Sequence, residues 1–125
     1  MDKQHLLFVD DEPMVLRGLQ RSLRKMRHEW EVLYAEDGEA ALALLASRPV
    51  DVVVTDMRMP GMDGAQLLAI VKERFPQVVR IILSGQLDRD MTLQSVRVAH
   101  QLLAKPCDID VLQSALQKTF ALNRI

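Results

Sequence analysis

An uninterrupted apolar run in the middle of the chain constrains the fold more than any other feature. Val52, Val53 and Val54 follow one another without a polar residue, and the run ends at Asp56. A short β-branched run of this kind is typical of a strand buried on both faces, as in a parallel sheet between two layers of helices. Proline and glycine residues typical of a turn follow within eight positions. The sequence therefore places a carboxylate where a buried strand leaves its sheet, at the edge where open α/β sheets bind ligands.

Strand and helix patterns alternate along the whole chain. Four further apolar segments predict strands at 5–9, 30–35, 79–83 and 101–104. Apolar spacing and capping residues predict helices at about 13–27, 40–46, 67–75, 88–100 and 109–120. Five strand-then-helix units indicate a parallel sheet covered on both faces, and they are too few for a closed barrel, which needs about eight. The sequence therefore predicts one α/β domain with an open, doubly wound sheet.

Composition narrows the class of protein further. The 125 residues are 49% apolar, which suffices for the core of one domain. The net charge is −1, so the chain as a whole lacks the excess of basic residues that is typical of proteins that bind nucleic acid or membranes. The single cysteine, Cys107, excludes an internal disulfide. We find neither a signal-peptide pattern nor an apolar run long enough to span a bilayer. We therefore expect a cytoplasmic domain that contacts neither a membrane nor nucleic acid directly.

Residues that can take part in catalysis or in metal binding follow four of the five predicted strands. They are Asp10, Asp11, Asp56, Ser84, Gly85 and Lys105. Each of them alone has an ordinary structural explanation as a helix cap, a turn residue or a solvated lysine. Since parallel strands bring their carboxyl ends to one edge, all six are expected to converge. This coincidence favours a functional site at that edge.

The three carboxylates predict a specific chemistry. At close range they repel one another unless a cation neutralises them. Oxygen ligands in an open, hydrated site suit Mg²⁺. Beside such a cation, Asp56 can act as a nucleophile toward an activated phosphoryl group and form an aspartyl phosphate. For Asp63, by contrast, we expect only a helix cap.

Four motifs together resemble the receiver domain of two-component response regulators. They are the acidic pair Asp10 and Asp11, the segment DMRMPGMDG that holds Asp56, the pair Ser84 and Gly85, and the pair Lys105 and Pro106. The resemblance covers essentially the whole chain, in the family's order and spacing. It implies a flavodoxin-like sheet of order 2-1-3-4-5. It also implies that 1–125 is a receiver domain, either stand-alone or part of a longer regulator.

The resemblance also implies roles for individual residues. Asp56 would be the phosphoacceptor, and Asp11 and Asp56 would ligate Mg²⁺ directly, with Asp10 acting through water. The backbone carbonyl of Arg58 would supply another ligand. The groups expected to balance the charge of the phosphoryl oxygens are Lys105, Ser84 and the N–H of Gly85.

Partners and output follow from the same resemblance. A histidine kinase or phosphotransfer protein would donate the phosphoryl group, and the domain would catalyse only its own phosphorylation and dephosphorylation. The surface of the fourth helix, fifth strand and fifth helix would bind an output domain in cis or a second copy of the chain. This sequence departs from the family pattern at Leu102, where an aromatic switch residue is common.

Two other classes remain as alternatives. A Mg²⁺-dependent phosphatase or hydrolase with an aspartate nucleophile also places a carboxylate at a strand end, but it needs a substrate pocket and usually a cap. A flavodoxin-like cofactor carrier shares the sheet order, but it needs a phosphate-binding loop of Ser, Thr and Gly after the first strand. This chain has the acidic sequence DDEP there.

Overall fold

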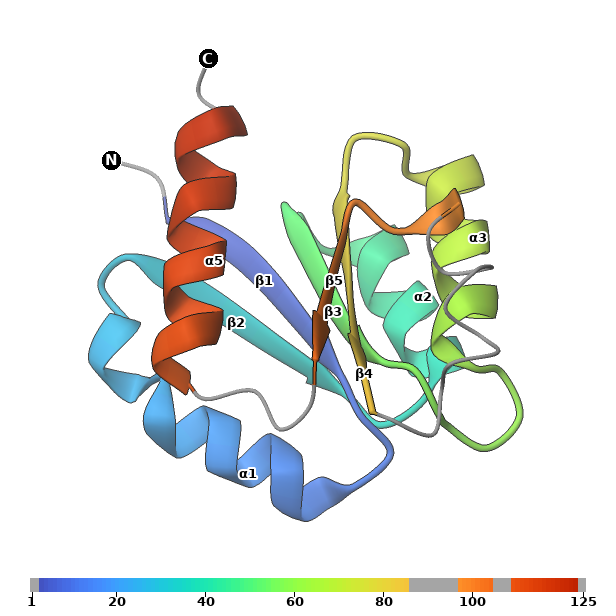
Figure 1. The fold of residues 1–125 in the computed structure, drawn as a ribbon, viewed down its shortest axis with the longest axis horizontal. Coiled ribbons are helices and arrows are strands. Elements are labelled where there is room, and N and C mark those ends of the chain that lie inside the picture. The colour runs from blue at the N-terminus through green and yellow to red at the C-terminus, as the bar shows by residue number, and fades with distance from the viewer. Residues whose placement is uncertain (1–2, 86–96, 105–108, 124–125) are drawn as a thin grey trace.

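The protein is a five-stranded parallel sheet between two layers of helices (Figure 1). The computed structural model describes residues 3–85, 97–104 and 109–123. The strands are β1 (Gln4–Val9), β2 (Trp30–Ala35), β3 (Val52–Asp56), β4 (Val79–Ser84) and β5 (Gln101–Ala104), in the order β2-β1-β3-β4-β5. The helices are α1 (Pro13–Ser22), the short 3₁₀ helix η1 (Arg24–Met26), α2 (Gly38–Ser47), α3 (Gly64–Arg74) and α5 (Ile109–Asn123). The predicted doubly wound sheet and its order are confirmed, while most of the helix expected at 88–100 lies outside the described residues.

The apolar residues of the strands form two cores, one on each face of the sheet. Along β1, Leu7 and Val9 pack toward α2 and α3, whereas Leu6 and Phe8 pack toward α1 and α5. Figure 1 shows these helix pairs on opposite faces. Every residue of β3 is buried, since this strand pairs on both edges and is covered on both faces, and the predicted buried strand is therefore confirmed. Within the described ranges, no helix is both long and apolar enough to cross a membrane.

The loops after β1 and β3 lead into α1 and α3, and local features stabilise the first turn of each helix. Pro13 is at the first position of α1, where its missing N–H costs nothing, and the carboxylate of Asp10 accepts a hydrogen bond from the Glu12 N–H at 2.9 Å. At the start of α3, Asp63 and Gln66 form a capping box with hydrogen bonds of 2.8 and 2.9 Å. The expected cap at Asp63 is confirmed, and the helix begins at once at Gly64.

The first helix is shorter than its sequence pattern predicts. The pattern extends to about residue 27, but α1 ends at Ser22 and the chain continues as η1. Here the Met26 N–H donates to the Leu23 carbonyl at 2.9 Å. A 3₁₀ helix has three residues per turn, so the side chains of Leu23 and Met26 lie on the same face, and both are buried. A spacing of three residues fits either helix type, and the pattern alone therefore does not distinguish them.

A buried arginine ties the start of β5 to its neighbours. Arg80 in β4 is only 7% exposed, and its Nε donates to the Val98 carbonyl at 2.7 Å. The Arg80 backbone N–H donates to Nδ1 of His100 at 2.9 Å, and the His100 N–H donates to the Arg80 carbonyl at 2.7 Å. From α3, Lys72 donates to the Arg97 carbonyl at 3.0 Å. These bonds hold the residues that lead into β5, at the end of the sheet opposite the loops after β1 and β3.

Acidification is expected to weaken the fold through His100. The pKa of His100 lies below its ordinary value of 6.5. The largest cause is the partial burial of the ring, and the positive charges of Arg80 and Lys72 lower the pKa further. His100 therefore binds a proton more readily in the unfolded chain than in the folded protein. The contribution of neutral His100 to the free energy of unfolding is complete above pH 6.5 and is lost as the pH falls through the folded-state pKa. Urea unfolding between about pH 7.5 and about pH 5 measures the loss.

The matched variant is His100→Asn, because the asparagine carbonyl can still accept from the Arg80 N–H but does not titrate. Its free energy of unfolding should fall less on acidification than that of the wild type. Parallel pH curves for wild type and His100→Asn would contradict the assignment.

Candidate functional site

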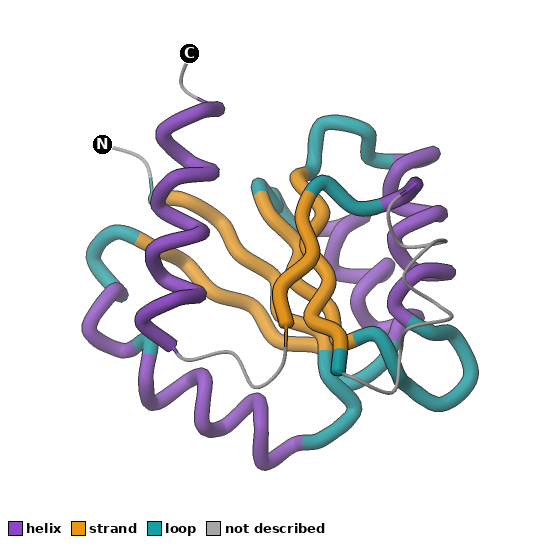
Figure 2. Tube along the Cα trace, viewed as in Figure 1, coloured by secondary structure: helices purple, strands orange, loops and turns teal. Residues whose placement is uncertain are grey.

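The strands all run in the same direction, so their carboxyl ends share one edge of the sheet. Figure 2 shows the loops that follow β1 and β3 side by side at that edge. Asp56 is the last residue of β3, and it pairs in register with Leu83 of β4. On the other side, Val9 of β1 pairs with Thr55. The chain therefore leaves β1 into Asp10 directly beside the end of β3.

Three carboxylates meet at this edge. Asp10, Asp11 and Asp56 each offer one oxygen atom, and these atoms all lie within 4.8 Å of one another. Asp10 is 4% exposed and Asp56 6% exposed, whereas Asp11 is half-buried. The hydrogen bond from the Glu12 N–H fixes the orientation of the Asp10 carboxylate. The structure thus brings together the acidic residues of two distant sequence motifs.

The chemistry of this cluster fits a hard divalent cation. Three carboxylates this close together, two of them buried, are costly unless a positive charge compensates them. All three donors are oxygen atoms, which Mg²⁺ prefers, and Mg²⁺ also retains several water ligands. An open cavity of about 470 Å³ adjoins the cluster and gives room for such ligands. Its lining residues are Asp11, Arg58, Met59, Pro60, Gly61 and Asp63.

The other residues expected at the site are described only in part. Ser84 ends β4 and pairs with Ala104 of β5, and Gly85 follows at the same edge. The backbone of β4 therefore passes beside the end of β3. The side chain of Ser84 and the whole of Lys105 lie outside the described residues. Arg58, whose backbone carbonyl was expected as a ligand, is exposed and lines the cavity beside Asp11.

Gly64 is a turn residue in the sequence pattern, but in the structure it contacts the site, which the sequence did not predict. The Gly64 N–H donates to the Met57 carbonyl at 2.8 Å. A Cβ atom at this position would contact the backbone oxygen of Asp56 and would lie 3.0 Å from Cα of Met57. The first residue of α3 therefore rests directly on the end of β3. The available signal was a glycine immediately after a helix cap, where most other residues favour the helix more.

Comparison with known proteins identifies the family. The model of the response regulator receiver domain matches residues 6–117. The hydrogenase transcriptional regulatory protein HoxA of Cupriavidus necator is 40% identical over 108 residues, which cover 84% of this chain and 22% of that protein. The DNA-binding transcriptional regulator NtrC of Salmonella typhimurium is 34% identical over 114 residues, covering 90% of this chain and 24% of that protein. The chain thus spans about a quarter of the length of these curated relatives.

Solved structures agree with this assignment. The signal receiver domain of an HD domain-containing protein from Pseudomonas fluorescens Pf-5 superposes with a TM-score of 0.91 at 31% identity, covering 98% of both chains. A CheY-like receiver domain protein from Methanospirillum hungatei shares the fold, with a TM-score of 0.90 at 20% identity. These findings favour a receiver over a hydrolase or a cofactor carrier. The chain belongs to the family of response regulator receiver domains, which are signalling domains of two-component systems.

Proposed function

We propose that this domain accepts a phosphoryl group on Asp56 from a histidine kinase or a phosphotransfer protein in the cytoplasm. The observation that carries the proposal is the burial of the Asp56 carboxylate beside Asp10 and Asp11, at the carboxyl end of the central strand. A carboxylate held beside a divalent cation is a competent nucleophile toward phosphorus. The domain would catalyse only its own phosphorylation and dephosphorylation.

The proposed cofactor is Mg²⁺. Asp11 and Asp56 would ligate it directly, Asp10 would act through water, and the Arg58 carbonyl would complete the protein's share of the ligands. Support comes from three oxygen donors within 4.8 Å of one another and from the adjoining open cavity. The bound ion would neutralise the carboxylates and the charge that develops on the phosphoryl oxygens.

In the proposed transfer, an Asp56 oxygen forms a bond to phosphorus while the P–N bond of the donor phosphohistidine breaks. The donor imidazole nitrogen keeps the electron pair of the broken bond. The charge on the phosphoryl oxygens would be balanced by the Lys105 ammonium, the Ser84 hydroxyl and the Gly85 N–H. The strand register supports this arrangement, because Ser84 pairs with Ala104, the residue before Lys105.

Phosphorylation would add roughly two negative charges to this edge of the sheet. We expect the response at the surface that comprises the helix after β4, β5 and α5, which would bind an output domain in cis or a second copy of the chain. Leu102 of β5 is half-buried and packs against the core that faces α2 and α3. The response would therefore proceed without the aromatic side chain that is common at this position.

Incubation with acetyl phosphate and Mg²⁺, followed by intact mass measurement, tests the proposal. We expect the addition of one phosphoryl group, which is lost in base, because an aspartyl phosphate is a mixed anhydride. Release of phosphate over many turnovers without covalent addition would support the hydrolase. Flavin absorbance retained on the purified protein would support the cofactor carrier.

Mg²⁺ is expected to stabilise the fold. A ligand that binds only the folded state stabilises it by about 2.7 kcal/mol at a concentration one hundred times its Kd. Asp11→Asn should abolish most of the rise in melting temperature, because it removes one of the three clustered carboxylates. Asp37→Asn is the matched control, since Asp37 caps α2 through the Ala40 N–H and asparagine caps equally well. An equal rise in both variants would place the cation elsewhere.

A further inference from the structure

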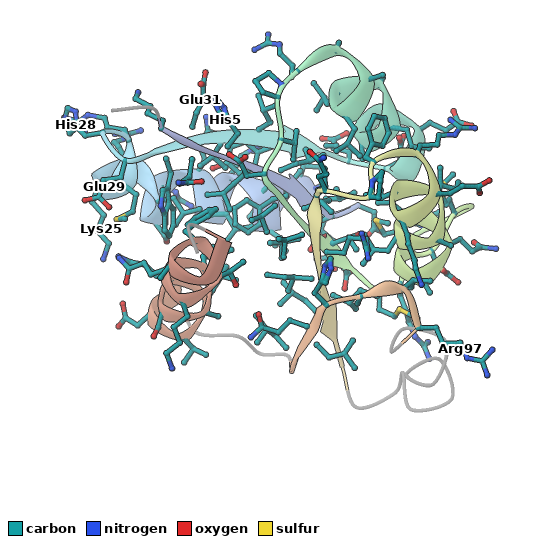
Figure 3. All side chains as sticks on the ribbon, turned by 90° about the horizontal axis from the view of Figure 1, so that it is seen from above. His5, Lys25, His28, Glu29, Glu31 and Arg97 are labelled. Atoms are coloured by element: carbon teal, nitrogen blue, oxygen red, sulfur yellow. The ribbon has the colours of Figure 1, made fainter. Side chains whose placement is uncertain are left out.

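The loop between β3 and α3 is rich in methionine. Residues 57–63 contain three of the chain's seven methionines, which are Met57, Met59 and Met62. All three pack with the core between the sheet and the helices α2 and α3, where Figure 3 shows side chains filling the space. The loop residues exposed between them are Arg58, Pro60 and Gly61. Thioether side chains therefore supply the apolar contacts that hold this loop to the protein.

The three methionines differ in how readily a dissolved oxidant reaches them. Met57 is fully buried and Met59 is 8% exposed, whereas Met62 is half-buried. The sulfur of Met62 packs against Gly38, the first residue of α2, where a Cβ atom would lie only 2.6 Å from it. This contact leaves no room for an added atom on the side of the sulfur that faces Gly38. Met62 thus joins the loop to α2 through a close apolar contact that is partly open to solvent.

Met59 joins the same loop to the end of β3. Its sulfur lies 4.0 Å from the Thr55 hydroxyl, which donates to the Asp56 carbonyl at 3.0 Å. Met59 also lines the cavity beside Asp11. A change that detaches Met62 from Gly38 therefore acts on a loop that forms part of the wall of this cavity.

We propose that Met62 is a reversible oxidation site, at which a hydroperoxide loosens the loop and slows phosphoryl transfer to Asp56. The thioether sulfur attacks the terminal oxygen of the hydroperoxide, and an S–O bond forms as the O–O bond breaks. The proton of that oxygen passes to the departing oxygen. The thioether is thereby oxidised to a sulfoxide, and the hydroperoxide is reduced to an alcohol, or to water if it is hydrogen peroxide.

The sulfoxide changes the balance between the core and water. It is polar and carries an additional oxygen atom, so Met62 as a sulfoxide favours solvent over the contact with Gly38. The loop then retains Met57 and Met59 as its apolar contacts and opens more often. The effect on Asp56 rests on the proposed function, whereas the loosening of the loop does not.

Limited digestion with trypsin, without Mg²⁺ or a phosphoryl donor, tests the loosening on the full chain. Trypsin cleaves after Arg58, which is exposed in this loop, once the loop opens. When hydrogen peroxide has converted Met62 to the sulfoxide, as peptide mass shows, cleavage after Arg58 should rise at least about fivefold. Cleavage after Arg17, in α1 on the opposite face of the sheet, should change less than about twofold. Methionine sulfoxide reductase should restore the original rate.

Two leucine variants separate Met62 from the other oxidisable side chains. Leucine replaces methionine at similar volume and has no sulfur to oxidise. Met62→Leu retains Cys107 and every other methionine, and its cleavage after Arg58 should not respond to peroxide. Met14→Leu removes a methionine of α1 that is 73% exposed, and it should respond as the wild type does. Circular dichroism and urea unfolding verify that both variants are folded.

Labelling with acetyl phosphate and Mg²⁺ tests the consequence for Asp56. Oxidised wild type should be labelled at least about fivefold more slowly than reduced wild type. Met62→Leu should be labelled at the same rate before and after peroxide treatment. If reduced wild type is not labelled at all, the proposed function fails, and the digestion still decides whether the loop is loosened.

Three results of the digestion would overturn the inference. They are a Met62 that stays reduced at peroxide concentrations that oxidise Met14, unchanged cleavage after Arg58 once Met62 is oxidised, and an equal rise in cleavage in Met62→Leu. The second result is read on the wild type alone and does not depend on the folding of a variant. Equal labelling of oxidised and reduced wild type would overturn the effect on Asp56.

Discussion

Asp56→Asn is expected to abolish phosphorylation by acetyl phosphate, lowering its rate about a thousandfold or more. The amide has nearly the same shape as the carboxylate but is no nucleophile. The proposed reaction consists of attack by this one side chain, so the residual binding of Mg²⁺ and donor cannot replace it. Intact mass after incubation with acetyl phosphate and Mg²⁺ should show only the unmodified protein.

Asp63→Asn provides the control for this result. Asp63 lines the same cavity as Asp11, but its carboxylate accepts the Gln66 N–H at 2.8 Å as a helix cap, a role that asparagine fills equally well. This variant should therefore be phosphorylated. If Asp56→Asn still gained a base-labile phosphoryl group, the phosphoacceptor would have to be sought at Asp10 or Asp11.

Gly64→Ala is expected to damage both stability and phosphorylation. The added Cβ atom would meet the backbone oxygen of Asp56 and Cα of Met57. Backbone atoms at a strand end cannot move aside as the end of a flexible side chain can, so α3 must shift away from β3. We expect the free energy of unfolding to fall by about 1–3 kcal/mol. Phosphorylation should slow as well, because Asp56 and Gly64 meet at the same point.

Gly18→Ala is the matched substitution. Gly18 lies within α1, and a Cβ atom there would meet nothing within 4 Å. Alanine should raise the free energy of unfolding by roughly 0.5–1 kcal/mol, because glycine loses more conformational freedom in a helix. Urea unfolding and the rate of acetyl phosphate labelling measure both variants. Wild-type values for Gly64→Ala would show that the strand end tolerates the methyl group.

The sheet was predictable because its signals are local. The apolar run at residues 52–54 is continuous because this part of the central strand is buried on both faces, where a polar side chain without a partner would be costly. Asp63 was identifiable as a cap because its hydrogen bonds connect residues three positions apart. The end of α1 was not predictable, since Leu23 and Met26 can face the core from either helix type.

Contacts between distant segments left little trace in the sequence. Arg80 lies within an apolar strand, and only the structure supplies the Val98 carbonyl and the His100 ring that satisfy it. In the sequence Gly64 is an ordinary turn residue, and only the structure places it in contact with the end of β3.

The sequence by itself determined the alternation of strands and helices, the parallel direction of the sheet and the presence of acidic residues at strand ends. These properties follow from the period of apolar side chains and from short-range capping, which act within a few residues. Only the tertiary structure decided how close Asp10, Asp11 and Asp56 lie, and that the first residue of α3 packs against the backbone of Asp56. Distances of a few ångströms between segments more than forty residues apart depend on strand register and helix packing. Both of these are set by contacts across the whole fold and not by neighbouring residues in the sequence.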